Sequence, residues 1–515
     1  MTETRPIVLE LRNITKRFGP LVANDAVDLV MRKGEILALL GENGAGKTTL
    51  MNILFGHYLA DTGEVLVADA HGGLQPLPPG SPHAALAAGI GMVHQHFTLA
   101  ENLTVLDNIT LGTEPLFALH RSTRAARTKL EDLMARSGLA VDLDATVARL
   151  AVGERQRIEI LKALYRDARI LVLDEPTAVL TPQESDGLFA TLRALAAQGL
   201  SVVFISHKLN EVVSASDRVA VLRGGRKVAE RETAGADRAT LAELMVGRPI
   251  AASRREPREP GRTVLKLDAV SVAGHDVRTR LASVSLDLRE GEVVGIAGVS
   301  GNGQTALASL VCGLVAPSAG TMTLLDHALT EFDPGAFVAA GIGRIPEDRH
   351  SEGVVGSMSI AENVALETIG TERFQTGGFL RFGAMRQAAE AAIRGYEIKC
   401  PGPDAPIRLL SGGNMQKAIL ARALDGAPKL IIANQPTRGL DVGAVAEVHR
   451  RLLAARMRGA AVLLISEDLD ELFELSDRIA VMFRSRLTAA LPSAGLDLKT
   501  LGLMMAGHDP AEVAA

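Results

Sequence analysis

The chain has 515 residues, 47% hydrophobic and 22% charged, which excludes a largely disordered protein. Its formal net charge of −5 argues against non-specific nucleic-acid binding, and its two cysteines are too few for a disulfide framework or a cysteine-rich metal site. The N-terminal residues contain no apolar signal core and no run of 18 apolar residues occurs, so we expect neither a signal peptide nor a membrane span.

The chain contains an internal repeat, which sets the expected domain organisation. Three segments of the first half recur in the second half in the same order. Residues 34–56 parallel 291–313, residues 150–177 parallel 410–437, and residues 202–212 parallel 462–472. We therefore expect one fold to occur twice, as domains 1–250 and 263–510. The joining residues 251–262 are charged, contain two prolines and lack apolar periodicity, so they are typical of an exposed linker.

Short aliphatic runs predict the strands of the first domain. Residues 36–40, 170–173 and 202–205 are almost entirely aliphatic, as in central strands that are covered on both faces. The first run leads into the glycine-rich stretch GENGAGKT (41–48) and then into KTTLMNILF (47–55), which predicts a helix. Strand, glycine loop and helix in this order indicate an α/β fold with a phosphate-binding loop.

The loop at 41–48 matches the complete phosphate-loop pattern. Its small residues let backbone N–H groups crowd around phosphates, Lys47 would reach the β- and γ-phosphates, and the Thr48 hydroxyl would bind Mg²⁺. The residues predicted to bind ATP here are Gly41, Glu42, Asn43, Gly44, Ala45, Gly46, Lys47, Thr48 and Thr49.

Further candidates lie elsewhere in the first half. The strand ILVLDEP (170–176) ends in Asp174, a predicted Mg²⁺ ligand, and Glu175, a predicted general base for the attacking water. Gln95 could sense Mg²⁺ and this water, and His207 could contact the γ-phosphate, although a histidine after a strand often has no such role. Phe18 could stack on adenine or could be a buried core residue.

The second half has a phosphate loop without its lysine. In GVSGNGQT (298–305) the glycines keep their spacing, but glutamine occupies the lysine position. The strand end that aligns with Asp174 and Glu175 reads ANQP (433–436) and has no carboxylate. These changes predict a degenerate nucleotide site. Its predicted members are Gly298, Gly301, Gly303, Gln304, Thr305, Asn434 and Gln435.

The order of these motifs resembles the nucleotide-binding domain of ABC transporters. GENGAGKTT, HQHF, LAVGERQ, LVLDEPT and ISHKLNEV follow one another in the first half, and the second half contains LSGGNMQ (410–416), the signature sequence of this ATPase class. The resemblance implies two tandem ABC-type P-loop ATPase domains, each with a helical signature subdomain. Fused domains with a lysine-free second loop resemble bacterial importers of ribose-type sugars and nucleosides, with the nucleoside branch the most similar.

In this family, domains pair head to tail, so each ATP would lie between one phosphate loop and the opposite signature. The resemblance therefore adds four residues to the first site, namely Ser411, Gly412, Gly413 and Asp441. The second site would receive Ala151 and Thr181 in place of serine and aspartate, and it has Glu347 and Glu467 at the positions of Gln95 and His207. All departures from the family pattern thus fall on one composite site.

The resemblance also implies partners and a location. The chain would bind ATP and Mg²⁺ and would drive two membrane-spanning permease subunits, fed by a periplasmic or lipoprotein solute-binding protein, from the cytoplasmic face of the inner membrane. The amphipathic stretch 120–139 could dock a permease subunit or could be a solvated helix. A ribosome-associated translation factor is an alternative of another class, although such factors have two intact sites and a long charged linker.

Overall fold

The computed structural model divides the chain into two compact units, Met1–Ile250 and Ala251–Ala515, and each is described by itself. The described residues are 5–69, 71–94, 97–113, 123–177, 180, 182–206, 208–247, 255–505 and 507–508. Within these ranges, no helix combines the length and the apolar character that a membrane crossing requires.

The first unit is built on a mostly parallel sheet whose central strand, β3 (Ile36–Leu40), leads into the phosphate loop. Its strands follow the order β10 (Arg226–Glu232), β9 (Arg218–Arg223), β3, β8 (Ser201–Ile205), β7 (Ile170–Asp174) and β6 (Ile90–Val93). Strands β3, β7 and β8 are buried along their whole length, which confirms the three strands predicted from aliphatic runs. Because β3, β7 and β8 are parallel, their carboxyl ends meet at one edge, where α/β sheets bind ligands.

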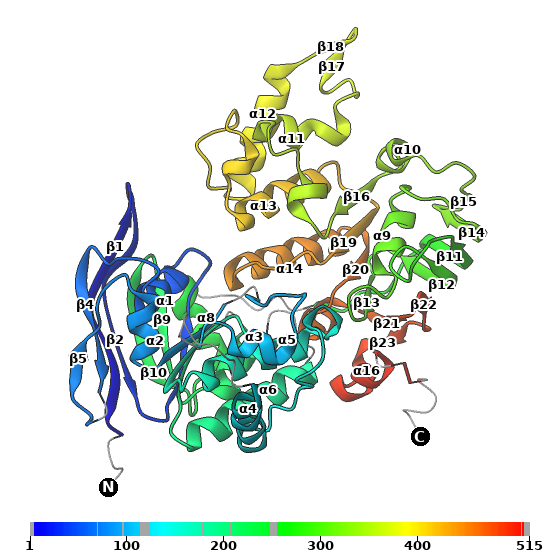
Figure 1. Cartoon of the computed structure of the whole chain (residues 1–515). Helices are drawn as coiled ribbons and strands as arrows, with labels where there is room; N and C mark the ends of the chain where they lie inside the picture. Colours follow the sequence, from blue (N-terminus) through cyan, green and yellow to red (C-terminus); the bar gives the residue numbers. More distant parts are fainter. Residues whose placement is uncertain are drawn as a thin grey trace. The chain divides into compact units, whose positions relative to one another are not determined.

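A second, antiparallel sheet packs on this core. Figure 1 shows its strands in blue, in the order β2 (Leu21–Arg32), β1 (Ile7–Phe18), β4 (Thr62–Ala68) and β5 (Leu74–Pro76). Alternate residues of β1 and β2, such as Leu9, Leu11 and Leu29, share a hydrophobic cluster with Leu50 and Leu54 of α1 (Lys47–Phe55). The helix that follows the phosphate loop is therefore held between two sheets.

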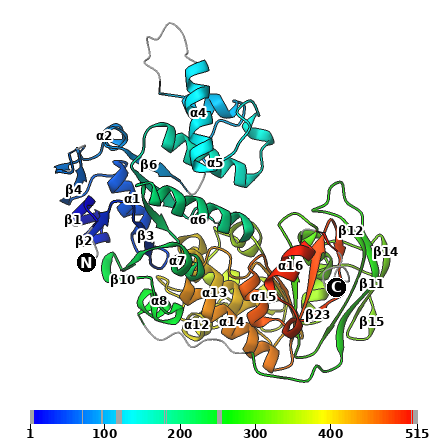
Figure 2. The same cartoon turned by 90° about the horizontal axis from the view of Figure 1, so that it is seen from below.

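Several helices of the first unit form a separate helical subdomain. Figure 2 shows α4 (Thr123–Ser137) and α5 (Val152–Tyr165) away from the strands β1, β2 and β4. With α3 (Val105–Thr110) they form the helical subdomain that contains the signature, and α4 confirms that residues within 120–139 are helical. The remaining helices are α2 (Pro82–Ala87), α6 (Pro182–Ala197), α7 (Leu209–Ala215) and α8 (Arg238–Val246).

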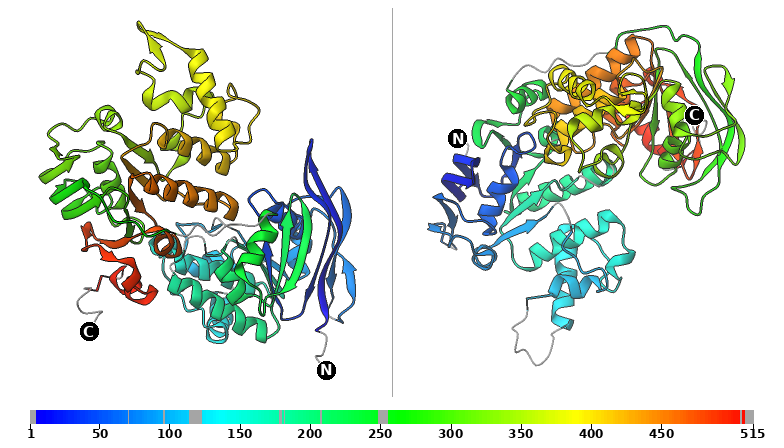
Figure 3. Two further views of the ribbon diagram at one scale, coloured as in Figure 1. Left: turned by 180° about the vertical axis from the view of Figure 1, so that it is seen from behind. Right: turned by 90° about the horizontal axis from the view of Figure 1, so that it is seen from above.

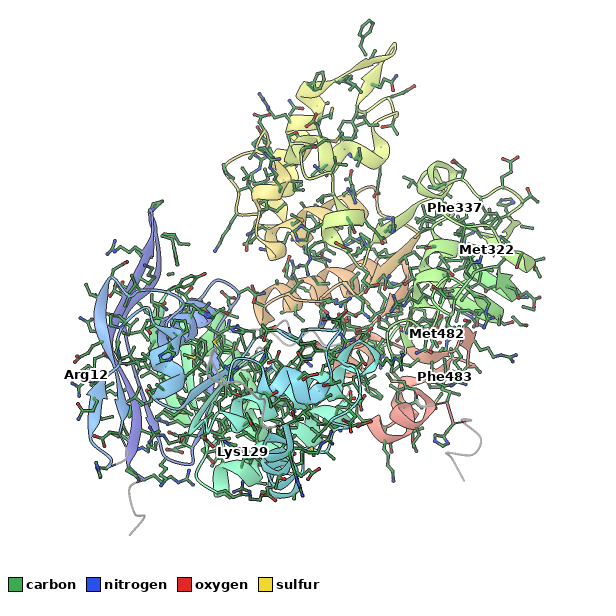
Figure 4. The ribbon with its side chains drawn as sticks, in the orientation of Figure 1. Arg12, Lys129, Met322, Phe337, Met482 and Phe483 are labelled. Atoms are coloured by element: carbon green, nitrogen blue, oxygen red, sulfur yellow. The ribbon has the colours of Figure 1, made fainter. Side chains whose placement is uncertain are left out.

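The second unit repeats this architecture. Its antiparallel sheet has the order β12 (Leu281–Arg289), β11 (Thr263–Val272), β14 (Ala319–Leu324) and β15 (His327–Ala328). Its larger sheet has the order β16 (Ile342–Ile345), β19 (Leu430–Asn434), β20 (Ala461–Ile465), β13 (Val293–Ala297), β21 (Arg478–Phe483) and β22 (Arg486–Leu487), with β23 (Leu491–Pro492) beside β21. The core of this unit includes Met322, Phe337 and Met482, which Figure 4 labels.

The helices of the second unit include its own signature subdomain. In Figure 3 the colours of this subdomain run from yellow-green through yellow to gold, along α11 (Ile360–Ala365), α12 (Phe382–Gly395) and α13 (Gly412–Ala423). The other helices are α9 (Gln304–Val311), α10 (Pro334–Ala339), α14 (Val442–Met457), α15 (Leu469–Leu475) and α16 (Leu498–Met505). A hairpin of β17 (Gln375–Thr376) and β18 (Phe379–Leu380) precedes α12.

The described part of the predicted linker is exposed, but it is also attached to the second unit. The Glu256 carbonyl accepts a hydrogen bond of 2.8 Å from Arg456, and Gly261 N–H donates to the Glu290 carbonyl at 2.9 Å. Arg456 is 1% exposed and binds both carboxylate oxygens of Asp477, at 3.1 and 2.9 Å. Residues 255–262 are therefore fixed on the second unit.

Candidate functional site

The first phosphate loop has the tight backbone that its glycines predict. Gly46 immediately precedes α1 with φ 96°, a left-handed conformation that other residues rarely adopt. A Cβ atom at Gly46 would lie 2.1 Å from the Ala23 carbonyl oxygen, so no side chain fits there. The loop thus opens directly onto the N-terminus of α1, whose backbone N–H groups favour anions.

Lys47 lies against this loop. The residue is 6% exposed, and its Nζ donates to the carbonyl oxygens of Gly41 at 2.8 Å and Glu42 at 2.9 Å. The same loop therefore holds both the backbone N–H groups and the ammonium group that would bind phosphate oxygens.

The two predicted Mg²⁺ ligands within the described residues lie together. Asp174 ends β7 and is 6% exposed, and its carboxylate is hydrogen-bonded to the Thr48 hydroxyl of α1. Burial, and the neighbouring Glu175 carboxylate, raise the pKa of Asp174 above its ordinary value. A divalent cation beside Asp174 and Thr48 would favour the ionised carboxylate, so the donor set fits Mg²⁺.

Glu175 follows β7 in an unusual backbone conformation. Its φ of 49° is in the left-handed region, and its N–H donates to the Ile205 carbonyl at 3.0 Å. Gln435, the aligned residue of the second unit, has the same φ and bonds the Ile465 carbonyl at 2.8 Å. The sharp turn after the strand is thus kept in both units, whereas the carboxylate is present only in the first.

Phe18 lies at the surface, so the alternative of a buried core residue is wrong. Its side chain is 43% exposed and meets Tyr58 edge to face, with ring centroids 5.6 Å apart. Tyr58, 41% exposed, was missed in the sequence, because nothing in the spacing links the end of β1 to the residues after α1. The pair offers an exposed aromatic surface on the first unit.

Three predicted residues, Gln95, Thr181 and His207, lie outside the described residues.

The second phosphate loop keeps the backbone shape but uses its own polar groups. Gly303 precedes α9 with φ 115°, and Gln304 is 8% exposed. The Gln304 amide donates to the Val299 carbonyl at 3.0 Å, and its oxygen accepts from Asn302 N–H at 3.0 Å. Gln304 therefore carries no positive charge, and it also accepts the hydrogen bond of one N–H group of the loop, that of Asn302.

The strand end beside this loop has also lost its charge. Asn434 is 6% exposed, and its Oδ1 has no hydrogen-bond partner among the described residues. The Gln435 side chain accepts from Glu467 N–H at 3.4 Å. Burial raises the pKa of Glu467, and the positive charge of Arg438 opposes that shift. Thr305 is exposed, and Gly298 and Gly301 lie in the loop as predicted.

The two signature turns differ in the residue that precedes the helix. Ser411 precedes α13, is exposed, and accepts a hydrogen bond of 2.8 Å from the Asn414 amide, so its own hydroxyl hydrogen is not used in that bond. Ala151 precedes α5 and has no hydroxyl. Gly412 and Gly413 begin α13, and Asp441 caps α14 by accepting from Ala444 N–H at 2.8 Å.

Two units of the P-loop fold, each with a helical signature subdomain, define the class of protein to which the chain belongs. The ABC transporter family matches residues 24–178 and 281–438. The chain is therefore a member of the ABC transporter family and an ABC-type ATPase.

Relatives match over nearly the whole chain. The glucose import ATP-binding protein TsgD13 of Haloferax volcanii is 42% identical over 543 residues, covering 99% of this chain and 98% of that protein. The nucleoside import ATP-binding protein NupA of Lactococcus lactis subsp. cremoris is 42% identical over 501 residues, covering 97% and 98%.

A solved structure shares the two-unit fold. It is the complex of the archaeal ribosomal stalk protein aP1 with the archaeal ribosome recycling factor aABCE1, with a TM-score of 0.61 and 19% identity, covering 93% of this chain and 90% of that chain. At this identity the likeness concerns the fold alone.

Proposed function

We propose that the chain is the ATP-hydrolysing subunit of an importer for nucleosides or simple sugars, with one competent composite ATP site. The observation that carries the proposal is the contrast between the two phosphate loops. The first has Lys47 beside a Thr48–Asp174 pair that fits Mg²⁺. In the second, the neutral Gln304 side chain accepts a hydrogen bond from the Asn302 N–H of the same loop. Relatives named as nucleoside and glucose import ATP-binding proteins support the solute class.

Within the competent site, each residue has a separate role. Lys47 and the loop N–H groups bind the β- and γ-phosphates, and Thr48 and Asp174 would hold Mg²⁺, which when bound neutralises phosphate charge. Glu175 accepts the proton of the attacking water, which in general contributes about 10²–10⁴ in rate. Gln95 orients this water and His207 contacts the γ-phosphate. Phe18, together with Tyr58, stacks on the adenine ring.

The second unit completes the site by delivering its signature. Ser411 donates its hydroxyl to the γ-phosphate, the N–H groups of Gly412 and Gly413 add to it, and Asp441 lies in the adjoining loop. The second phosphate loop is retained because its unit must supply these groups. This arrangement requires domains 1–250 and 263–510 to pair head to tail, with 251–262 between them.

The chain does its mechanical work on separate membrane proteins. We propose two membrane-spanning permease subunits as direct partners and a periplasmic or lipoprotein solute-binding protein as an indirect one. The chain would then be peripheral, on the cytoplasmic face of the inner membrane. Import ATP-binding relatives that match nearly end to end support this view.

Co-purification and uptake test the proposal together. The tagged chain, extracted in detergent, should bring down membrane proteins, and its deletion should stop uptake of a labelled nucleoside or of a simple sugar such as ribose. A strain that carries Lys47→Ala is the matched control, because it retains the chain but has weaker phosphate binding. Co-sedimentation with ribosomes and unchanged uptake of both solute classes would contradict an import role and favour a translation factor.

A further inference from the structure

A network of charged side chains joins three loops of the second unit beside its signature. Arg438 lies in the loop 437–441, which ends at Asp441, and its guanidinium contacts the Glu347 carboxylate at 2.5 Å. Glu347 and Arg349 both belong to the segment that follows β16. The Arg349 guanidinium in turn donates a hydrogen bond to the Arg438 carbonyl. The segment thus holds Arg438 by its side chain and by its backbone.

Arg349 also packs against the signature itself. A Cβ atom at Gly412 would lie 3.1 Å from Arg349 Nη1, and one at Gly439 would lie 3.4 Å from Nη2. The guanidinium therefore lies between the first residue of α13 and the loop 437–441. Its Nη1 is buried and has no hydrogen-bond partner among the described residues, and burial lowers the pKa of Arg349.

The aligned positions in the sequence of the first unit do not carry the charged residues of this network. By the repeat, Phe97 stands at the Arg349 position and Ala178 at the Arg438 position, and Gln95 stands where the second unit has Glu347. Val152 replaces Gly412, so the first signature also carries a side chain where the second leaves space for a guanidinium. The charged network is thus found beside the second signature, which contains Ser411, and its residues are absent from the aligned positions beside the first signature, which contains Ala151.

We propose that Glu347 and Arg349 are positioning residues that hold the signature turn at 411–413 and the loop 437–441 in one fixed arrangement. The inference rests on the proposed function, in which both loops face the ATP held by Lys47. By its alignment with Gln95, Glu347 belongs to the degenerate site of the second unit. We infer that it instead supports hydrolysis at the competent site, which receives the second signature. Neither residue contacts the reacting atoms.

The test compares variants of the full-length chain, assembled with the membrane proteins that co-purify with it. We expect Arg349→Ala to lower kcat for ATP hydrolysis about tenfold and Glu347→Gln about two- to fivefold, with KM for ATP changed less than twofold. The exchanged pair Glu347→Arg with Arg438→Glu should recover most of the loss seen with Glu347→Arg alone. The control is Arg386→Ala, which breaks an ion pair of 2.7 Å with Asp404 in the same subdomain.

Ser411→Ala separates the two hypotheses. If it lowers kcat while Arg349→Ala and Glu347→Gln match the control, the positioning role is wrong and the composite site stands. If Ser411→Ala also leaves kcat unchanged, the composite site is wrong, and the positioning role falls with it. A fall in Tm that parallels the loss of kcat across all these variants, without recovery in the exchanged pair, would also overturn the positioning role.

Discussion

The two phosphate loops share a backbone and differ in charge. In both, a buried strand leads into a loop whose last glycine has a left-handed φ, and the residue after that glycine is buried. In the first loop this residue is Lys47, an ammonium held by two carbonyls. In the second it is Gln304, which accepts from one loop N–H and donates to one loop carbonyl. The comparison teaches that the backbone conformation of the loop is the same whether the buried side chain is charged or neutral.

Removing the carboxylate that we propose as the general base should have the largest effect. Glu175→Gln should lower the hydrolysis rate by about 10²–10⁴, because the water loses its general base, while ATP binding persists. Multi-turnover phosphate release from the assembled transporter measures the rate. The matched control is Gln435→Glu, which adds a carboxylate beside Asn434 and should change nothing. Near-normal turnover by Glu175→Gln would remove this residue from its role.

The second largest difference is expected between variants that remove the buried side chain of each phosphate loop. Lys47→Ala should weaken ATP binding about ten- to a hundredfold, because a charge-assisted hydrogen bond contributes about 1.5–3 kcal/mol. Gln304→Ala should leave hydrolysis within about twofold, since its amide serves its own loop. Equilibrium binding of labelled ATP and steady-state hydrolysis report the two effects. Equal losses in both variants would show that the loops are functionally equivalent.

A buried histidine should make the stability of the second unit depend on pH. His449 is 4% exposed and lies 3.1 Å from Glu471 and 3.5 Å from Glu474, whereas the aligned residue of the first unit is Phe189. Burial lowers its pKa, but the hydrogen bonds to both carboxylates outweigh burial and raise the pKa of His449 to about 9.

Since the pKa of His449 is raised above its ordinary value of 6.5, the stabilisation is complete below pH 6.5 and is lost as the pH rises through about 9. This linkage predicts a loss of up to about 3 kcal/mol in unfolding free energy over that range. Urea unfolding at several pH values should show this slope, and His449→Phe should remove it without affecting hydrolysis. His327→Ala, an exposed site, is the control, and an unchanged slope in His449→Phe would contradict the assignment.

The sequence predicted the elements that depend on local pattern. Aliphatic runs predicted β3, β7 and β8, and the glycine loop predicted the start of α1 at Lys47. Contacts between distant residues were not predictable in this way. Nothing in the spacing indicates that Phe18 meets Tyr58 at the surface, or that Glu347 pairs with Arg438, 91 residues later. Side-chain orientation also escaped prediction, because only the structure shows that Gln304 binds the amide of Asn302.

The signature residues test the asymmetry between the two sites most directly. Steady-state ATP hydrolysis should be measured for Ser411→Ala and Ala151→Ser in the assembled transporter. The account predicts a fall of about ten- to a hundredfold for Ser411→Ala, if its hydroxyl contributes about 1.5–3 kcal/mol in the transition state. It predicts an unchanged rate for Ala151→Ser, because Gln304, Asn434 and Gln435 still prevent chemistry at the other site. Equal losses in the two variants, or a gain with Ala151→Ser, would contradict the account.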